Sequence, residues 1–377
     1  MMAPYVGLER RVLAALEATP TRIPVLLGGC GTGRTTALTA LAERLGREEC
    51  QYIDVERAAS TPERFFAAVN AASPFPRSGP GVAPRSAREA FDHTLAYLAQ
   101  TRALDRPVTF LLDELLELRT FESFPGLRHI QRELVQALQE SGNRFVLTSR
   151  YVARAHRLLR DATARFEVIH LPALSASEVN AMLPATGGPA SDDRDFLSRT
   201  IQALSDGRAA YVRAISEATT GSGRTGDPIS ALTALLTSDG LLTAWCGYRY
   251  ELRLHRARGY GALKAILEIL ADEEPLTLTE IAQRLHRTPG STKDYLSWLE
   301  DVDLVVSRQK RYSFTDPVLR LWVRLHCRPV PPTVDEVARE VQSYALARLP
   351  QPEPPLALAG AVVGTSERKR WGIVEID

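Results

Sequence analysis

The residues from Gly28 to Thr36 have the types and spacing of a phosphate-binding loop. They read Gly28-Gly29-Cys30-Gly31-Thr32-Gly33-Arg34-Thr35-Thr36 and lie between an apolar run and a segment of helical composition. Glycines let the backbone wrap closely, so that successive N–H groups and the start of a helix point at phosphate oxygens. The hydroxyl of Thr35 stands where such a loop binds Mg²⁺. We therefore expect residues 28–36 to hold the phosphates of a nucleotide together with Mg²⁺.

Arg34 stands where a loop of this kind usually has lysine. Lysine is a compact point charge, whereas the guanidinium group of arginine is planar, bulkier and directional, although it still pairs with phosphate. We expect ATP binding to be retained and hydrolysis to be slow or absent. Cys30 is expected to serve as a small residue within the loop, with a redox-sensitive thiol as the alternative.

A second motif consists of an apolar run from Val108 that ends in Asp113 and Glu114. Ligands of open α/β sheets bind at the carboxyl ends of the strands. There, Asp113 would hold Mg²⁺ through water, and Glu114 would polarise the water that attacks the terminal phosphate. Alone, the pair would favour a strand that ends in a solvated acidic turn, because Asp-Glu after apolar residues is common. The phosphate-binding loop upstream favours the nucleotide site.

A third run, Arg144–Arg150, predicts a strand that ends in hydroxyl residues. If this strand lies between the two motif strands, Thr148 or Ser149 would contact the terminal phosphate or the attacking water. The alternative is that the serine caps the next helix, and the two roles are compatible.

Strand and helix patterns alternate from residue 6 to about residue 171, which predicts a sheet with helices on both faces. The prolines at 74, 76, 80 and 84 predict a long loop over 73–86. Helical patterns follow from 175 to 219, and residues 220–228 have the composition of a linker. The expected strands are 24–28, 51–55, 107–113, 144–149 and 166–171.

The C-terminal part predicts a winged helix-turn-helix. Residues 229–257 are helical in pattern and end in a basic stretch, and three short helices over 262–271, 278–285 and 291–299 precede a hairpin over 304–314. Acidic neighbours weaken the local field for DNA, so a protein partner is the alternative. The cations expected to face DNA phosphates are Lys293, Arg308, Lys310 and Arg311.

This order of motifs resembles the AAA+ ATPases, most closely the prokaryotic, archaeal-ATPase-like branch with ties to the STAND class, over roughly residues 5–326. Residues 5–10 are similar to the adenine-side motif, although Leu8 stands where arginine is typical. The lid lacks the STAND proline, since Ala209 or Ala210 occupies its place. The resemblance implies an arginine finger at Arg165 and a lid sensor at Arg208; surface roles are the alternative.

The resemblance implies an α/β P-loop NTPase fold with a parallel sheet and a helical lid, followed by an α-rich winged-helix domain. It also implies a homo-oligomer, because an arginine finger acts on a neighbouring subunit. The expected domains are an ATPase core over 1–172, a lid over 173–220, a linker with connecting helices over 221–257, a winged helix over 258–328, and a C-terminal helix and tail over 329–377.

Composition excludes few functions. The chain of 377 residues is 45% hydrophobic and 24% charged with a net charge of +1, so any surface for nucleic acid must be local. No apolar segment has the length of a membrane span, and no membrane partner is expected. Four scattered cysteines indicate a reduced, cytoplasmic protein.

Three functions remain open at this point. The first is a nucleotide-dependent switch whose winged helix reports to DNA or to a protein. The second is a DNA-binding regulator with a degenerate, non-hydrolysing core. The third is a small-molecule kinase, against which the Asp113-Glu114 pair and the winged helix argue.

Overall fold

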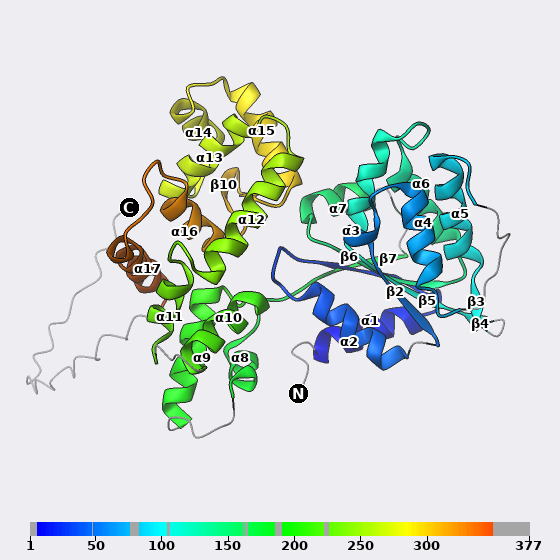
Figure 1. Ribbon diagram of the computed structural model, residues 1–377, viewed down its shortest axis with the longest axis horizontal. Helices are drawn as coiled ribbons and strands as arrows, with labels where there is room; N and C mark the ends of the chain where they lie inside the picture. Colours follow the sequence, from blue (N-terminus) through cyan, green and yellow to red (C-terminus); the bar gives the residue numbers. More distant parts are fainter. Residues whose placement is uncertain are drawn as a thin grey trace, which may run out of the picture.

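The computed structural model describes residues 6–46, 48–75, 83–103, 106–160, 162, 165–184, 191–221 and 226–349. A parallel sheet with helices on both faces forms one part, and a helical lid and a winged helix form the other (Figure 1). In the described part of the chain, every helix is too short or too polar to cross a bilayer.

The central sheet has five parallel strands in the order β2-β5-β6-β1-β7. The strand that carries the hydroxyl run, β6, therefore lies between the two motif strands, as the third motif requires. All five expected strands are present within two residues of their predicted bounds, and their bounds are β1 Ile23–Leu27, β2 Cys50–Asp54, β5 Thr109–Asp113, β6 Arg144–Ser149 and β7 Phe166–His170.

Burial on both faces explains why β1, β5 and β6 are rich in apolar residues throughout. Side chains of a strand alternate between its faces, so Leu26 and Leu111 belong to one core while Val25 and Phe110 belong to the other. The helices of this part are α1 Val6–Glu17, α2 Arg34–Leu45, α3 Val55–Ala58, α4 Pro62–Ala71, α5 Ala87–Gln100, α6 Ile130–Glu140 and α7 Val152–Leu159, with a 3-10 helix η1 over Leu115–Ser123.

The start of β5 and the loop over 73–86 differ in how far the structure follows the sequence-based expectation. The strand expected from residue 107 starts at Thr109, because β4 (Arg106–Pro107) pairs instead with β3 (Arg102–Ala103) in a separate small hairpin. Of the loop expected over 73–86, residues 76–82 lie outside the described residues, and the described ends carry no helix or strand before α5.

The lid consists of short helices that pack on one another. Its first helix, α8, starts with a capping box in which Ser175 and Glu178 satisfy each other's backbone N–H groups. Residues 222–225 of the expected linker lie outside the described residues, and α11 packs back on α9 and α10. The bounds are α8 Ala176–Met182, α9 Ser191–Ser205, α10 Ala209–Thr220 and α11 Pro228–Leu235.

The helix α12 leads from the lid to the winged helix, and α17 returns to pack on α11 and α16 (Figure 1). The winged helix has three short helices and an antiparallel sheet in the order β8-β10-β9. The bounds are α12 Leu241–Arg256, α13 Tyr260–Asp272, β8 Leu276–Thr277, α14 Leu278–Arg284, α15 Pro289–Asp301, β9 Val305–Arg308, β10 Arg311–Phe314, α16 Pro317–His326 and α17 Val334–Arg348.

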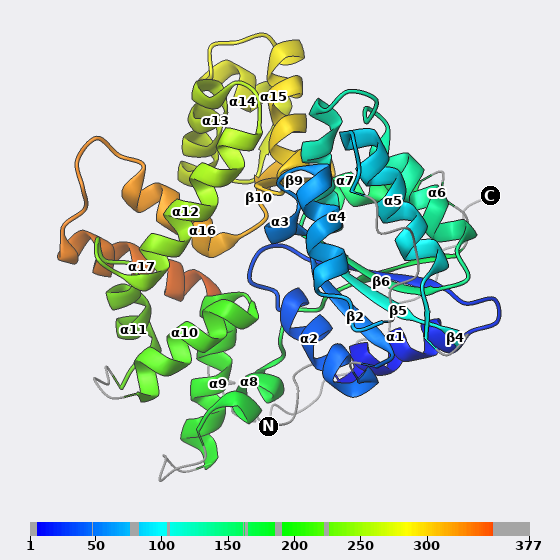
Figure 2. The same cartoon turned by 45° about the vertical axis from the view of Figure 1, so that its right-hand side comes forward.

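The winged helix is not an isolated module. The helix α15 contacts α7 of the sheet domain (Figure 2). An ion pair between Arg157 of α7 and Asp301 of α15 joins the two. One hydrophobic core runs from the lid through α12 into the winged helix.

Candidate nucleotide-binding site

The phosphate-binding loop joins β1 to α2 at the carboxyl edge of the sheet. Gly31 and Gly33 have φ of 80° and 94°, a left-handed conformation that side chains disfavour, and α2 begins directly after Gly33. Space is also tight at Gly28, where a Cβ would lie 2.7 Å from Oγ1 of Thr32 and would force that side chain to move. The strand, glycine-rich turn and helix that the sequence predicts are all present.

The Arg34 side chain folds back onto its own loop. Its Nη1 donates hydrogen bonds to the carbonyl oxygens of Gly28 and Gly29, and its Nη2 forms an ion pair with Glu114. The residue is only 7% exposed. The guanidinium group thus ties the phosphate-binding loop to the end of β5.

Asp113 and Thr35, the two expected Mg²⁺ ligands, lie in contact. Oγ1 of Thr35 donates to Oδ2 of Asp113 at 2.7 Å, and the hydroxyl of Tyr52 donates to the same oxygen at 2.9 Å. Burial and the Asp113 carboxylate raise the pKa of Tyr52, which keeps this hydroxyl protonated. A hydroxyl and a carboxylate are hard oxygen donors, so the pair fits Mg²⁺.

Glu114 is held in a strained and charged state. Its φ of 57° is left-handed, which is costly for a residue with a Cβ. Its Oε2 lies 3.1 Å from Nε of Arg150 and accepts the Arg150 backbone N–H at 3.0 Å. Burial alone would raise the pKa of Glu114, but Arg34 and Arg150 together hold it below its usual value. The expected water-polarising carboxylate is therefore ionised but paired with two arginines.

Thr148 connects the two carboxylates. Its Oγ1 donates to Oδ1 of Asp113 at 2.5 Å and accepts the backbone N–H of Glu114 at 2.9 Å. Ser149 does not cap a helix as one interpretation expected. Its Oγ accepts the N–H of Tyr151 at 3.1 Å, and Tyr151 itself is the N-cap of α7.

The two arginines assigned by resemblance lie in different places. Arg208, the expected lid sensor, precedes α10 and its Nη1 donates to the Cys30 carbonyl at 3.0 Å. Arg165 directly precedes β7 and therefore lies at the amino ends of the strands, away from the phosphate-binding loop. There it donates to the carbonyls of residues 21, 139 and 141. Arg165 does not reach this chain's own phosphate-binding loop, and its action on a neighbouring subunit stays a prediction.

Sequence reasoning assigned no role to three arginines of α12 that line a cavity of about 550 Å³ beside the loop. They are Arg249, Arg253 and Arg256, which share one helix face because they are spaced four and three residues apart. The same spacing within the basic stretch was the signal that could have found them. Arg150, at the end of the third motif, also lines this cavity.

Arg253 joins the loop to the winged helix. It is 3% exposed, and it donates to Sγ of Cys30 at 2.5 Å and to the Asp303 carbonyl at 2.9 Å. Burial would raise the pKa of the Cys30 thiol, but Arg253 and the arginines at 150, 34 and 249 lower it below its usual value. The Cys30 side chain is therefore a contact point for α12.

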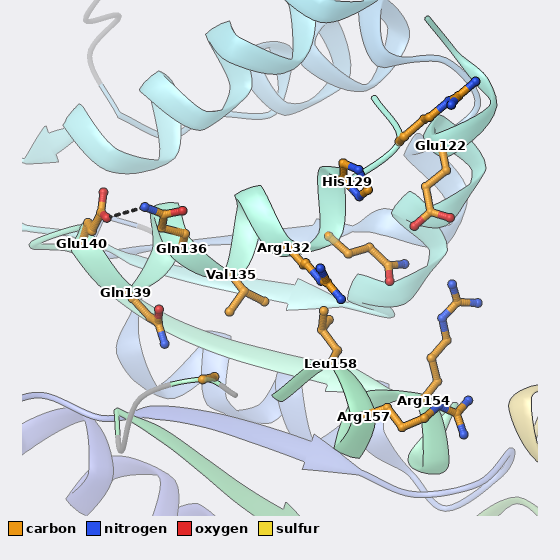
Figure 3. Close-up of a pocket in the computed structure, with 13 residues that line it drawn as sticks. Glu122, His129, Arg132, Val135, Gln136, Gln139, Glu140, Arg154, Arg157 and Leu158 are labelled. Carbon is orange, nitrogen blue, oxygen red and sulfur yellow. Dashed lines mark hydrogen bonds between the residues drawn. The ribbon is translucent and has the colours of Figure 1, made fainter. Parts of the chain in front are cut away.

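A larger cavity of about 720 Å³ lies between α6 and α7, away from this site. Figure 3 shows Arg132, Arg154 and Arg157 around it, with Glu122 and Glu140 also on its wall. Burial and nearby Arg119 lower the pKa of Arg154 to about 10. None of the expected site residues lines this cavity.

Comparisons with known proteins agree with this architecture. A family model described as a winged helix-turn-helix DNA-binding domain matches residues 262–306. A Walker-type ATPase of Pyrococcus abyssi is similar in structure, with a TM-score of 0.64 and 17% identity over 85% of this chain and 95% of that one. The ORC2 protein of Aeropyrum pernix, in ADPNP and ADP complexes, has a TM-score of 0.51 and 15% identity over 90% of this chain and 92% of that one.

The chain shares the fold of these two structures, and its C-terminal part is a winged helix. The expected fold class is thus confirmed. No curated protein matches the sequence.

The four expected DNA-facing cations of the winged helix are all exposed. Gln309 and Lys310 form the tip of the wing with left-handed φ of 52° and 63°. Arg311 lies 3.8 Å from Glu280, and Asp294 is exposed one residue after Lys293. The wing is accessible, and acidic groups lie beside α15, the expected recognition helix of the winged helix, as the sequence indicated.

Proposed function

We propose that this chain is a nucleotide-dependent switch that binds ATP with Mg²⁺ at residues 28–36 and reports the bound state through its winged helix. One observation carries the proposal. The Arg208 guanidinium group donates both to the Cys30 carbonyl of the phosphate-binding loop and to the Thr315 carbonyl of the winged helix. It also lies 3.6 Å from Asp316.

This contact gives a physical route from nucleotide to winged helix. The side chain of Arg208 is 11% exposed, so its hydrogen bonds are made in a largely dry environment where they are strong. Tyr211 of α10 donates to Asp316 at 2.7 Å and strengthens the same junction. Any phosphate that draws Arg208 towards itself must weaken its bonds to residues 315 and 316.

The residues around the loop suit Mg-ATP. The backbone N–H groups of the loop would cradle phosphates, and Thr35 and Asp113 would hold the metal. Bound Mg²⁺ would supply charge neutralisation at the phosphates. Glu114 would orient water, but its two oxygens already pair with Arg34 and Arg150. We therefore propose weak hydrolysis, or hydrolysis that depends on a partner such as a second subunit that supplies Arg165.

DNA is the proposed partner of the winged helix. Arg308, Lys310 and Arg311 lie together at the exposed wing, and Lys293 is exposed near the start of α15. Cations in this arrangement contact the phosphate backbone. A protein partner would instead depend on the acidic groups at 280 and 294.

One observation favours an alternative function, that of a DNA-binding regulator with a degenerate core. The hydrogen bonds from Nη1 of Arg34 to Gly28 and Gly29, and the ion pair of its Nη2 with Glu114, give both terminal nitrogens protein partners without any nucleotide. A core held in this way would be structural, and DNA affinity would then not respond to ATP.

Two measurements on the purified full chain test the proposal. Calorimetric titration with Mg-ATP should give saturable binding that weakens when Mg²⁺ is chelated. Fluorescence anisotropy should then show that saturating Mg-ATP changes the affinity for a labelled DNA duplex. ATP binding without any effect on DNA or protein partners would overturn the switch, and DNA binding without ATP binding would establish the alternative.

A further inference from the structure

The cavity beside the phosphate-binding loop is lined by residues of the sheet domain and by the helix α12. The sheet domain contributes Thr35, Asp113 and Glu114 together with Arg34 and Arg150, and α12 contributes its three arginines. A role of α12 at this site rests on the proposed binding of ATP.

Two of the three arginines are committed to protein partners. Arg253 bonds to Cys30 and to the Asp303 carbonyl. Arg256 donates to Glu117 at 2.6 Å and to the Tyr151 hydroxyl at 2.7 Å. These bonds hold α12 against the sheet domain, so the third arginine is presented from a fixed helix.

Arg249 differs from both. Its Nη1 is buried and has no hydrogen-bond partner among the residues that the structure describes. A buried cationic donor without an acceptor is costly, and such groups in native proteins have a reason to be there. An anion that enters the cavity would satisfy this nitrogen.

The position of Arg249 is set by its neighbours. Its guanidinium carbon lies 5.9 Å from the ring centre of Tyr211 and 5.7 Å from that of Trp245, within the range of cation–π attraction. A Cβ placed on Gly31 would lie 3.6 Å from Nη1 of Arg249. The guanidinium group therefore faces the backbone of the phosphate-binding loop at close range.

We propose that Arg249 binds the terminal phosphate of ATP and makes the site prefer ATP to ADP. A carboxylate that orients the attacking water must face the terminal phosphate, and Glu114 lines the same cavity as Arg249. Because Arg249 faces the loop at Gly31 and lines the cavity together with Glu114, we assign it to that phosphate rather than to the inner ones. The helix α12 leads into the winged helix and helps to position it. The helix that carries Arg249 would therefore link the terminal phosphate to the winged helix.

The test is nucleotide binding by the full chain carrying Arg249→Met, which removes the charge and keeps an apolar stem for Tyr211 and Trp245. Dissociation constants for Mg-ATP and Mg-ADP are measured by calorimetry for this variant, the wild type and Arg258→Met. Arg258 is exposed and lies beyond α12, so its replacement makes the same charge change away from the cavity.

We expect Arg249→Met to weaken ATP binding about tenfold or more, as for one lost charge-assisted hydrogen bond, while ADP binding changes less than about twofold. Arg258→Met should leave both constants unchanged. Equal weakening of ATP and ADP, or no weakening of ATP, would overturn the assignment of Arg249 to the terminal phosphate. A wild type that binds neither nucleotide would instead refute the proposed function, and the two failures are thus distinguishable.

Discussion

Arg34 is the residue on which the proposed chemistry of the site depends. In the structure its guanidinium group satisfies two carbonyl oxygens of its own loop and neutralises Glu114. A lysine has three donors on one point and cannot span these partners in the same way. The arginine thus restrains both the loop and the carboxylate that would orient water.

The first prediction is that Arg34→Lys raises ATP turnover. A lysine cannot span the loop carbonyls and Glu114 as Arg34 does, so Glu114 loses one of the two cations that hold it. We expect the turnover rate to rise about tenfold, which is equivalent to lowering the barrier by ~1.4 kcal/mol. Phosphate release under saturating Mg-ATP measures it.

Glu114→Gln provides the matched variant. It should bind ATP as the wild type does and abolish residual hydrolysis, alone and when combined with Arg34→Lys. Equal turnover in all of these proteins would mean that Glu114 does not act on the attacking water.

The second prediction concerns Asp303, a buried carboxyl whose Oδ2 has no hydrogen-bond partner in the described part of the chain. Burial raises its pKa from 3.8 to about 6 despite nearby Arg253 and Arg208. A folded-state pKa above the unfolded value means that this group lowers the free energy of unfolding as pH rises from 3.8 to about 6.

Replacement by asparagine removes this titration and suits the left-handed φ of 56° at the position. The difference in unfolding free energy between Asp303→Asn and the wild type should shift in favour of the variant by on the order of 1–3 kcal/mol between pH 4 and pH 7. Denaturant unfolding across this range measures it. Parallel pH profiles for the two proteins would contradict the assignment.

At the scale of elements, the wing carries exposed cations, and α15 exposes Lys293 while it also contacts α7 of the sheet domain. The third prediction is that the double variant Arg308→Ala/Lys310→Ala weakens DNA binding and lowers the salt dependence. Loss of two phosphate contacts should reduce the slope of log K against log salt by about 2. Anisotropy titrations at several salt concentrations measure the slope.

Arg339→Ala serves as the control, because this exposed arginine of α17 lies outside the winged helix. A slope that drops equally in the control, or that stays unchanged in the double variant, would assign DNA contact to another surface.

The elements of the sheet were predictable for a physical reason. Strands buried on both faces must be apolar throughout, so β1, β5 and β6 are visible as runs, and their shared carboxyl edge brings Thr35, Asp113 and Thr148 together. The place of Arg208 beside the loop followed from the resemblance.

The remaining features depend on contacts between distant segments. The bonds from Arg34 to loop carbonyls depend on side-chain rotamers, which no sequence pattern encodes. The role of α12 depends on how the lid and winged helix fold over the sheet domain, which brings Arg253 to Cys30 across 223 positions of sequence. Ser149 fits a cap by residue type, but the backbone places the start of α7 two residues further on.

At the scale of the whole molecule, the phosphate-binding loop is the point where the sheet domain, the lid and the winged helix meet. Arg208 and Arg253 each touch the loop and the winged helix at once. In the proposed switch, these two arginines would couple the state of the loop to the position of the winged helix.

The fourth prediction is that Arg208→Ala uncouples the two. The variant should still bind Mg-ATP, since Thr35, Asp113 and the loop backbone are untouched. Its DNA affinity should then no longer change with ATP, whereas that of the wild type should. A variant that retains the full ATP response would assign the coupling to Arg253 and α12 instead.

Hydrogen exchange of the full chain with and without saturating Mg-ATP tests the central claim most directly. We expect ATP to change exchange in the loop over residues 28–36 and also in α12 and in β9 and β10, and we expect the distant change to diminish in Arg208→Ala. Binding of ATP with changes confined to the phosphate-binding loop would contradict a switch that acts through the winged helix.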